Sequence, residues 1–390
     1  MRRLLLVSHY ALPHVGGMEM VIDAEARELA RRGWDVVHVA SAPPNLPGGP
    51  ADPRPDGYRV VRVGALNALE ERLGVPYPVF APALLPVLDR EIARADVVHA
   101  HGFLYMSSVL ALLLARHRRP GAVRVLTEHV GHVDYETRAL DLAESAAIAG
   151  IGRLSTRAAE GLITMNPKVA DALRGLAPGR PVELIANGVD TEAFRPAAPA
   201  ARAALRVRLG WDERPRVLFV GRLVAKKGVD VALAAAAAAP DAFRLVVAGP
   251  GRLPGPAPAN VDLLGAVAPE RVAELMQAAD AFLLPSRGEG FPVTAQEAMA
   301  SGLPAVLADD PNYAAHVGGA GDGVRLVAPE GGAVAAALRE LLADPDARSA
   351  AGARAAAHAQ RAFSWGAAMD AHEALFARLS ARRSAPTPPA

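Results

Sequence analysis

Short runs of apolar residues, separated by polar turns, recur along the whole chain. The first run covers residues 4–9 and ends in a polar pair. Residues 19–31 follow a turn that contains Gly16 and Gly17, and their apolar positions are spaced as on one face of a helix. A third run covers residues 34–40 and has the length of a strand. Because two strands joined by a helix run in the same direction, this unit predicts a parallel sheet.

The same alternation of strands and helices continues to about residue 190. Further apolar runs of strand length cover residues 58–63, 96–100, 123–127, 161–165 and 182–185. Helical patterns lie between them at residues 103–116, 140–157 and 167–173, whereas residues 42–56 are rich in proline and glycine and predict a loop. Residues 1–190 are therefore expected to form a complete doubly wound α/β domain.

A second series of strands and helices fills the rest of the chain. It follows residues 191–201, whose proline and alanine content indicates a linker. The predicted strands cover residues 216–220, 244–247, 261–264, 281–284, 305–307 and 324–327, and the main helices cover residues 229–239, 269–278 and 332–342. They predict a second doubly wound domain over residues 202–363. Two last helices are expected at residues 346–360 and 364–381, before a disordered tail at residues 382–390.

The composition excludes several classes of protein. A chain of 390 residues suits two domains better than one core. Its net charge of +1 argues against a nucleic-acid partner, and the absence of cysteine excludes disulfides and thiolate nucleophiles. The longest apolar stretch, residues 103–115, is shorter than the ~18 residues of a membrane-spanning helix. We expect a cytoplasmic protein with at most peripheral membrane contact.

Two carboxylates and a predicted helix start lie together in residues 283–306. Gly290 permits a sharp turn after the strand, and Pro292 suits the first helical position. The free N–H groups at a helix start attract an anion. Glu289 and Glu297 stand beside this position, where they could accept hydrogen bonds from hydroxyl groups such as those of a sugar or a ribose.

The spacing of Glu289 and Glu297 resembles the Glu-x7-Glu motif of the retaining glycosyltransferases with the GT-B fold, in particular the large family 4 group. The letters around the glutamates, PS, EGF, EAMA and GLPAV, match that family as well. The resemblance implies an α/β architecture of two Rossmann-like domains that face each other across a cleft. It also implies that the final helix, residues 364–381, packs back onto the first domain. For this stretch alone, a strand–helix unit with two surface glutamates is the alternative.

A second motif contributes cations. The segment Gly221-Arg222-Leu223, followed by Lys227-Gly228, is similar to the GRL…KG motif of the same family. The resemblance assigns Arg222 and Lys227 to the diphosphate of a nucleotide sugar. Negative charge grows on the diphosphate when the sugar leaves, so two fixed cations would stabilise it. The alternative is a pair of solvated surface cations.

Further donor-side residues follow from the resemblance. They belong to a glycine loop after the first strand, to the motif that contains Arg222, to a loop near the nucleotide base and to the turn that carries the first glutamate. These residues are Gly16, Gly17, Gly221, Gly249, Gly290, Phe291 and Pro292. The loop around Gly249 superficially matches a dinucleotide fingerprint, but Pro254 and Pro256 would block the helix that such a motif requires.

Histidines cluster at the ends of two predicted strands. His99 and His101 alternate and therefore point to one face, and His129 ends the next strand. A metal site that also uses His132 and Asp134 is conceivable from the residue types. The resembling family uses no metal on the diphosphate, so we expect no metal. The resemblance assigns His101 to the hydroxyls of the donor sugar, while His129 is an acceptor-side candidate and His99 is interpreted as structural.

Two other charged segments are interpreted as structural. Asp344-Pro345-Asp346 matches a metal-binding D-x-D motif but lies between two helices, where aspartate and proline serve as stop and cap. Arg116, Arg118 and Arg119 either contact anionic lipid or solvate a helix end, and we expect the second. The segment from Asp309 to Tyr313 departs from the usual family pattern, which points to a different base or acceptor preference.

These observations together predict a retaining, metal-independent glycosyltransferase. It would move a hexose-type sugar from a UDP- or GDP-linked donor to the hydroxyl of a small-molecule, lipid-linked or saccharide acceptor. The nucleotide sugar is a co-substrate, and no other cofactor is expected. The residues predicted to be catalytic are His101, Arg222, Lys227 and Glu289, with Glu297 on the ribose. The alternatives are a nucleotide-sugar 2-epimerase of the same fold and a non-catalytic nucleotide-sugar-binding protein.

Overall fold

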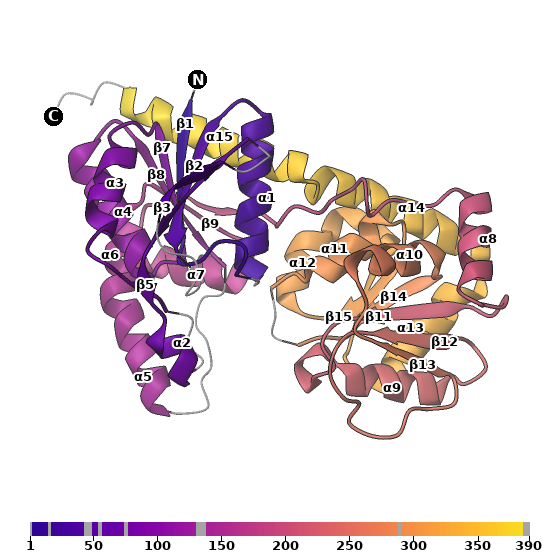
Figure 1. Cartoon of the computed structure of the whole chain (residues 1–390). Helices are drawn as coiled ribbons and strands as arrows, with labels where there is room; N and C mark the ends of the chain where they lie inside the picture. Colours follow the sequence, from indigo (N-terminus) through magenta and orange to yellow (C-terminus); the bar gives the residue numbers. More distant parts are fainter. Residues whose placement is uncertain are drawn as a thin grey trace. The chain divides into compact units, whose positions relative to one another are not determined.

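The computed structural model describes residues 2–14, 17–42, 49–53, 57–73, 77–129, 138–287 and 290–384. The chain divides into two compact units (Figure 1). Unit 1 contains residues 1–185 and 368–390, and unit 2 contains residues 186–367.

Unit 1 is built on an eight-stranded sheet within the described residues, in the order β10-β9-β8-β7-β1-β2-β4-β3. Its strands are β1 (Arg3–Val7), β2 (Asp35–Ser41), β3 (Gly49–Pro53), β4 (Arg59–Val63), β7 (Val97–His101), β8 (Val123–Glu128), β9 (Gly161–Thr164) and β10 (Val182–Leu184). Every neighbouring pair is parallel except β3 with β4. The strand order runs outward from β1 in both directions, which confirms the predicted doubly wound arrangement.

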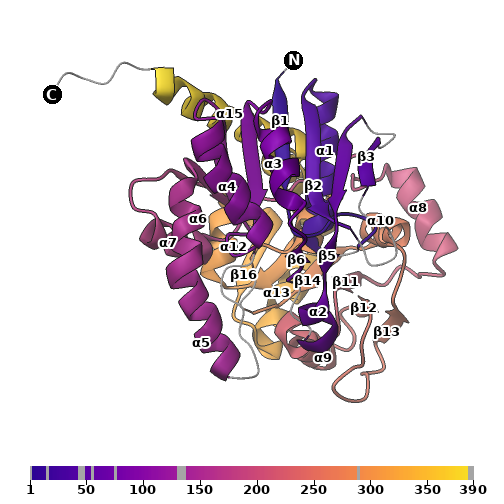
Figure 2. The ribbon, with the colours of Figure 1, turned by 60° about the vertical axis from the view of Figure 1, so that its left-hand side comes forward.

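Helices cover both faces of this sheet (Figures 1 and 2). The helices of unit 1 are α1 (Gly17–Arg31), α2 (Ala68–Leu73), α3 (Leu84–Ile92), α4 (Met106–Arg118), α5 (Arg138–Ala147), α6 (Arg153–Ala158), α7 (Pro167–Leu176) and α15 (Trp365–Ser384), and a small hairpin pairs β5 (Ala65–Leu66) with β6 (Val79–Phe80). Leu5 and Val7 share a buried cluster with residues of α3 and α4. Side chains alternate across a strand, so the opposite face is free for α1 and α15.

Two segments of unit 1 differ from the sequence prediction. The expected long helix at residues 140–157 is interrupted by a π-helical turn, Ile148–Gly152. The backbone of Gly152 lies against Phe103, and a Cβ there would come within 2.6 Å of that ring. The expected loop at residues 42–56 contains β3. This edge strand tolerates Pro53, since an outer strand leaves one row of backbone groups unpaired.

The last helix contacts unit 1 and is longer than predicted. Trp34 Nε1 donates a hydrogen bond of 2.9 Å to Glu373, and Arg32 lies 2.7 Å from Asp370. The helix ends at Ser384, three residues into the segment expected as a tail. Arg383 holds this final turn by pairing with Glu160 at 2.5 Å. None of the helices in the described ranges is long and apolar enough to cross a membrane.

Unit 2 is built on a six-stranded parallel sheet in the order β13-β12-β11-β14-β15-β16, counted over the described residues. The strands are β11 (Arg216–Val220), β12 (Arg244–Ala248), β13 (Val261–Gly265), β14 (Ala281–Leu284), β15 (Ala305–Ala308) and β16 (Val324–Val327). The helices are α8 (Pro199–Arg208), α9 (Val229–Ala238), α10 (Pro269–Ala278), α11 (Val293–Ala300), α12 (Pro311–Val317), α13 (Gly331–Ala343) and α14 (Pro345–Ala362), with 3-10 turns at Ala225–Lys227 and Gly318–Gly323. This order again runs outward from its first strand, as predicted.

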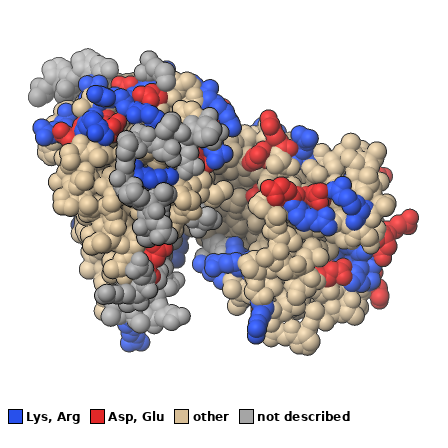
Figure 3. Space-filling view, viewed as in Figure 1, with Lys and Arg blue, Asp and Glu red and all other residues tan. Residues whose placement is uncertain are grey.

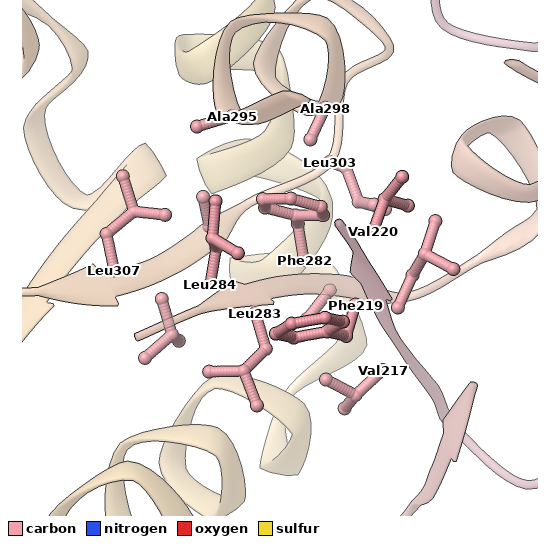
Figure 4. Close-up of a cluster of buried hydrophobic side chains, with 14 of the residues drawn as sticks. Val217, Phe219, Val220, Phe282, Leu283, Leu284, Ala295, Ala298, Leu303 and Leu307 are labelled. Carbon is pink, nitrogen blue, oxygen red and sulfur yellow. The ribbon is translucent and has the colours of Figure 1, made fainter. Parts of the chain in front are cut away.

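The core of unit 2 shows why these short apolar runs form central strands. Phe282 and Leu284 point to one side of β14, toward α11, and Leu283 points to the other side (Figure 4). All three side chains are fully buried. Because both faces are covered by helices, the strand needs apolar residues at every position instead of every second one.

The prediction of a linker at residues 191–201 is wrong. Phe194 lies in the core of unit 2, and Pro199 begins α8. The sequence prediction also omitted α12, although Asp310 caps it by accepting a hydrogen bond of 2.9 Å from the backbone of Asn312. Asp344 caps α14 in the same way, which confirms its structural interpretation.

Candidate functional site

The centre of the unit 2 sheet is a topological switch point. β11 lies between β12 and β14, and the chain proceeds from it in opposite directions. Ligands of doubly wound sheets bind beyond the carboxyl ends of the strands at such a point. Arg222 and Lys227 follow β11, whereas Gly290 and Glu297 follow β14. The structure therefore places four of the predicted residues at the switch point.

The loops that follow β11 and β14 are in direct contact. The backbone N–H of Arg287 donates a hydrogen bond of 2.9 Å to the carbonyl of Lys226. Gly228 has a φ of 72°, and a Cβ there would lie 2.3 Å from the carbonyl oxygen of Pro285. Only glycine fits this position, so the lysine turn is held against the turn that precedes α11.

Glycines also bring the ends of β11 and β12 together. The N–H of Gly221 donates a hydrogen bond of 3.0 Å to the carbonyl of Ala248. A Cβ on Gly249 would lie 1.9 Å from the carbonyl oxygen of Gly221, so a side chain there is excluded. The side chain of Lys227 lies over Gly221, and Arg222 is exposed on the same loop. The loop thus presents two cations at the carboxyl edge of the sheet.

The start of α11 is suited to an anion. The N-cap of the helix is Pro292, so the helix begins at Val293, one residue later than predicted. The first turn contains no acidic residue, and its N–H groups carry the partial positive charge of the helix end. Phe291 is 4% exposed and stacks on His316 at 5.1 Å. Its side chain therefore belongs to the core, and only its backbone is available to a ligand.

Glu297 lies one turn inside α11 and is half-buried. Burial raises the pKa of its carboxyl to about 7. No hydrogen-bond partner of this carboxyl occurs in the part of the chain that the structure describes. A carboxylate in this state is an acceptor for hydroxyl groups. Glu289, predicted beside it, lies outside the described residues.

Unit 1 has its own switch point between β1 and β7. Gly17 is the first residue of α1, and nothing lies within 4 Å of a Cβ added there, so a ligand could approach its backbone. Gly16 lies outside the described residues. His101 is the last residue of β7, and His129 directly follows β8. These predicted residues therefore lie at the carboxyl edge of the unit 1 sheet.

The histidines of this edge form a buried network with Glu25. The rings of His99 and His101 lie 4.3 Å apart on one face of β7, as their alternation predicts. His99 Nε2 lies 2.7 Å from Thr127 Oγ1, and His99 Nδ1 lies 2.8 Å from Glu25 Oε1. His101 is fully buried, with Nδ1 at 3.1 Å from His129 Nε2 and Nε2 at 3.7 Å from Glu25 Oε2. Of the two predicted histidines, only His129 is partly exposed.

Burial and charge fix the protonation of this network. Burial lowers the pKa of His101 well below its ordinary value, and that of His129 to about 4. Burial alone would raise the pKa of Glu25, but the charge and hydrogen bond of His99 outweigh it and hold the pKa below its usual range. At neutral pH the imidazoles of His101 and His129 are therefore neutral, and Glu25 is ionised.

Sequence analysis missed Glu25, although one signal was available. The residue lies on the inward face of α1, together with the buried Ile22, Ala26 and Leu29. A glutamate in the middle of an apolar stripe requires a buried partner. That partner, His99, comes from a strand more than seventy positions away, so helical spacing alone could not identify it.

Glu25, His99 and His101 are also the one group of potential metal ligands found among the described residues, with ligand atoms within 4.8 Å of one another. The Glu25 carboxylate already contacts His99 directly, at 2.8 Å, so this buried carboxylate–imidazole contact accounts for the proximity of the two side chains. His132 and Asp134, which the sequence offered as further ligands, lie outside the described residues.

An aromatic group near the end of β1 was not predicted either. The ring of His9 stacks on Tyr105 at 3.8 Å, and Tyr77 also stacks on Tyr105, at 5.8 Å. His14 lies 3.0 Å from Glu19 and 3.3 Å from a second carboxylate, that of Glu70. Rings and carboxylates of this kind suit a ligand with hydroxyl groups.

Comparisons with known proteins cover both units. Residues 15–193 match the family model described as Glycosyltransferase Family 4, and residues 201–358 match the model described as Glycosyl transferases group 1. The chain is 32% identical to the D-inositol 3-phosphate glycosyltransferase of Xylanimonas cellulosilytica, over 95% of this chain and 93% of that protein. It is 33% identical to D-inositol 3-phosphate glycosyltransferase 1 of Catenulispora acidiphila, over 91% and 89% of the two chains.

Solved structures share the fold at lower sequence identity. The sucrose-phosphate synthase of Thermosynechococcus elongatus superposes with a TM-score of 0.70 at 21% identity, over 98% of this chain and 100% of that chain. The Anabaena protein HepE in complex with UDP-glucose gives a TM-score of 0.66 at 19% identity, over 96% and 99% of the two chains.

Proposed function

The chain belongs to the family 4, group 1 glycosyltransferases, and on this premise we propose that it moves a hexose-type sugar from a nucleoside diphosphate donor to an acceptor hydroxyl. The transfer would retain the configuration of the sugar and need no metal ion. The observation that carries the proposal is the group at the unit 2 switch point. Arg222, Lys227, the start of α11 and Glu297 are grouped there.

Each member of this group matches one part of such a donor. The two cations and the N–H groups of α11 bind the diphosphate, since guanidinium, ammonium and helix-start N–H groups all favour phosphate oxygens. Glu297 accepts hydrogen bonds from the ribose hydroxyls, and Glu289 accepts them from the sugar. The loop that contains Gly249 borders the base.

The chemistry requires stabilisation of the leaving group more than a protein nucleophile. When the bond between the sugar and the phosphate breaks, negative charge builds on the diphosphate, and Arg222 and Lys227 neutralise it. The acceptor hydroxyl attacks from the face that the diphosphate leaves. A phosphate oxygen then takes the proton of that hydroxyl, so that no side chain has to act as a base.

In unit 1, His129 is the better candidate for contact with the sugar. His101 is enclosed by His129 and Glu25, so its polar atoms are directed to protein groups. His129 is partly exposed and neutral, and its bond to His101 fixes the orientation of its ring. We assign His101 and Glu25 to positioning His129.

The names of similar proteins suggest which donors and acceptors should be tested first. HepE is described in complex with UDP-glucose, and two relatives are named for D-inositol 3-phosphate. UDP-glucose is therefore the first donor for a screen, beside other UDP- and GDP-linked hexoses. Polyols and sugars are the first acceptors. A donor that binds only the folded protein raises the melting temperature, which identifies it before the acceptor is known.

The decisive variant is Lys227→Ala. If Lys227 supplies about 2.7 kcal/mol to the transition state, transfer measured in EDTA-containing buffer should fall by ~100-fold. Lys226→Ala removes an exposed neighbouring lysine and serves as the matched control. Near-normal turnover of Lys227→Ala would refute the assignment. Conversion of the donor alone into its 2-epimer would favour the epimerase instead.

A further inference from the structure

Two pockets lie at the amino edge of the unit 1 sheet, where β8, β9 and β10 begin. The first, of about 540 Å³, is lined by Arg116, Pro120, Gly121, Arg124, Glu160, Ser380 and Arg383. The second, of about 460 Å³, is lined by Arg116, Arg157, Ala177, Pro178, Gly179 and Arg180. Arg116 lines both, so the two pockets adjoin at its side chain. They form one region, built from the ends of four helices and the loops before three strands.

This region carries more positive than negative charge. Its five cations are Arg116, Arg124, Arg157, Arg180 and Arg383, and its one lining carboxylate is Glu160. Figure 3 shows lysine and arginine gathered at the upper end of unit 1, where β1 begins in Figure 1, with some carboxylates among them. The Glu160 carboxylate neutralises part of the charge of Arg383 and Arg124, because it accepts a hydrogen bond of 2.8 Å from Arg383 and lies 3.2 Å from Arg124.

Three of the arginines have no carboxylate to neutralise them within the described ranges. Arg157 donates to the carbonyl of Leu176 at 3.3 Å, and Arg180 donates to the carbonyl of Arg157 at 3.1 Å. Arg116 is exposed on the last turn of α4 and has no partner among these residues. These three arginines thus line the pockets with no carboxylate in the described part of the chain to balance their charge.

The negative partial charge of the helix C-termini balances only part of the positive charge of these arginines. α4, α6, α7 and α15 all end in this region, and a helix C-terminus carries roughly half a negative elementary charge. Four such ends and Glu160 offset about three of the five positive charges. Burial lowers the pKa of Arg124, and the charges of Arg383, Arg116 and Arg180 lower it further, against the opposing effect of Glu160. The cations thus repel one another at close range, and an anion would relieve that repulsion.

We propose that these two pockets bind a phosphate-bearing anion, either a soluble phosphate compound or the phosphate of a lipid headgroup. Guanidinium groups match phosphate oxygens with paired hydrogen bonds, and an arginine cluster is therefore more selective for phosphate than a diffuse positive surface. The backbone is also accessible, because nothing lies within 4 Å of a Cβ built on Gly121 or Gly179.

The site is separate from the one proposed for sugar transfer. β8 begins at Val123, next to the pockets, and ends at Glu128, next to His129. Six extended residues span roughly 20 Å. The two sites share no residue, so anion binding here stands or falls independently of the proposed function.

The test is calorimetric titration of the full chain with pyrophosphate at constant ionic strength. The double variant Arg116→Glu, Arg180→Glu changes two exposed side chains and should still fold, which circular dichroism would verify. We expect it to bind pyrophosphate at least tenfold more weakly than the unaltered chain. Arg361→Glu, an exposed arginine on α14, is the control and should bind normally.

The candidate donor site also attracts a diphosphate, so Arg222→Ala is measured in parallel. A binding event that disappears in Arg222→Ala but persists in the double variant would overturn the proposal. Cosedimentation with phosphatidylglycerol and phosphatidylcholine vesicles then distinguishes the two sources of phosphate. Binding to phosphatidylglycerol alone, lost in the double variant, identifies a headgroup, and pyrophosphate binding without vesicle binding identifies a soluble compound. Binding of neither probe would also overturn the proposal.

Discussion

Glu25, which is buried, and Glu297, which is half-buried, have opposite electrostatic surroundings. Glu25 is paired with His99, which holds its pKa below the ordinary value in spite of burial. Glu297 has no such partner, and burial raises its pKa to about 7. Glu25 is therefore ionised at neutral pH, whereas Glu297 changes its protonation state close to neutral pH. The two side chains should therefore respond to pH in opposite directions.

For Glu297, stability should decrease as the pH rises. The folded-state pKa lies above the ordinary value of 4.5, so the stabilising contribution is complete below about pH 4.5 and is lost as the pH rises through 7. The loss amounts to at most about 3 kcal/mol. Donor affinity should change in the other direction, rising roughly tenfold from pH 6 to pH 8 if the ionised form binds the ribose. Urea unfolding and calorimetry of Glu297→Gln should show both dependences removed, and their persistence would contradict the assignment.

For Glu25, stability should decrease as the pH falls. Its folded-state pKa lies below 4.5, so its contribution is present above that pH and is lost on acidification. Glu25→Gln leaves His99 without its buried carboxylate, and breaking such a pair typically costs 3–5 kcal/mol. Urea unfolding at pH 7 would measure this loss. Unchanged stability, together with unchanged pH dependence of transfer, would show that the network positions nothing.

At the scale of elements, close contacts between loop backbones define the donor side. Gly249→Ala would place a Cβ 1.9 Å from the carbonyl oxygen of Gly221, so the loops after β11 and β12 must separate. We expect a loss of 2 kcal/mol or more in stability, or of tenfold or more in donor affinity. Gly255→Ala is the matched control, because nothing lies within 4 Å of its Cβ. Thermal unfolding and donor titration of both variants would check the prediction, and equal behaviour of the two would contradict it.

The elements also show how far sequence reasoning extends. Central strands such as β14 could be predicted because both faces are buried and every residue is apolar. Arg222, Lys227 and Glu297 could be placed because parallel strands bring their carboxyl ends to one edge. The edge strand β3, the helix α12 and the Glu25 network were missed. Strand β3 carries few apolar residues. Helix α12 is short and follows a polar capping residue, so its sequence resembles that of a loop. The Glu25 network depends on a contact between segments that are distant in the sequence.

At the scale of the whole molecule, unit 1 is discontinuous in sequence. It combines residues 1–185 with α15, whose Leu375, Phe376 and Leu379 are at most 4% exposed. Each of these side chains contributes roughly 2–5 kcal/mol when buried, and together they approach the net stability of a typical domain. A chain that ends at residue 367 should therefore lose the fold of unit 1 while unit 2 stays folded. Hydrogen exchange would show this as fast exchange in peptides of residues 1–185 only, and slow exchange there would refute it.

This division of unit 1 affects how the protein is made. Domains usually fold as they leave the ribosome, the first one first. Here residues 1–185 keep an uncovered apolar strip until α15 has been translated, whereas unit 2 can be complete before that. Translation arrest before residue 368 would therefore leave unit 1 incomplete, with apolar surface open to chaperones or aggregation.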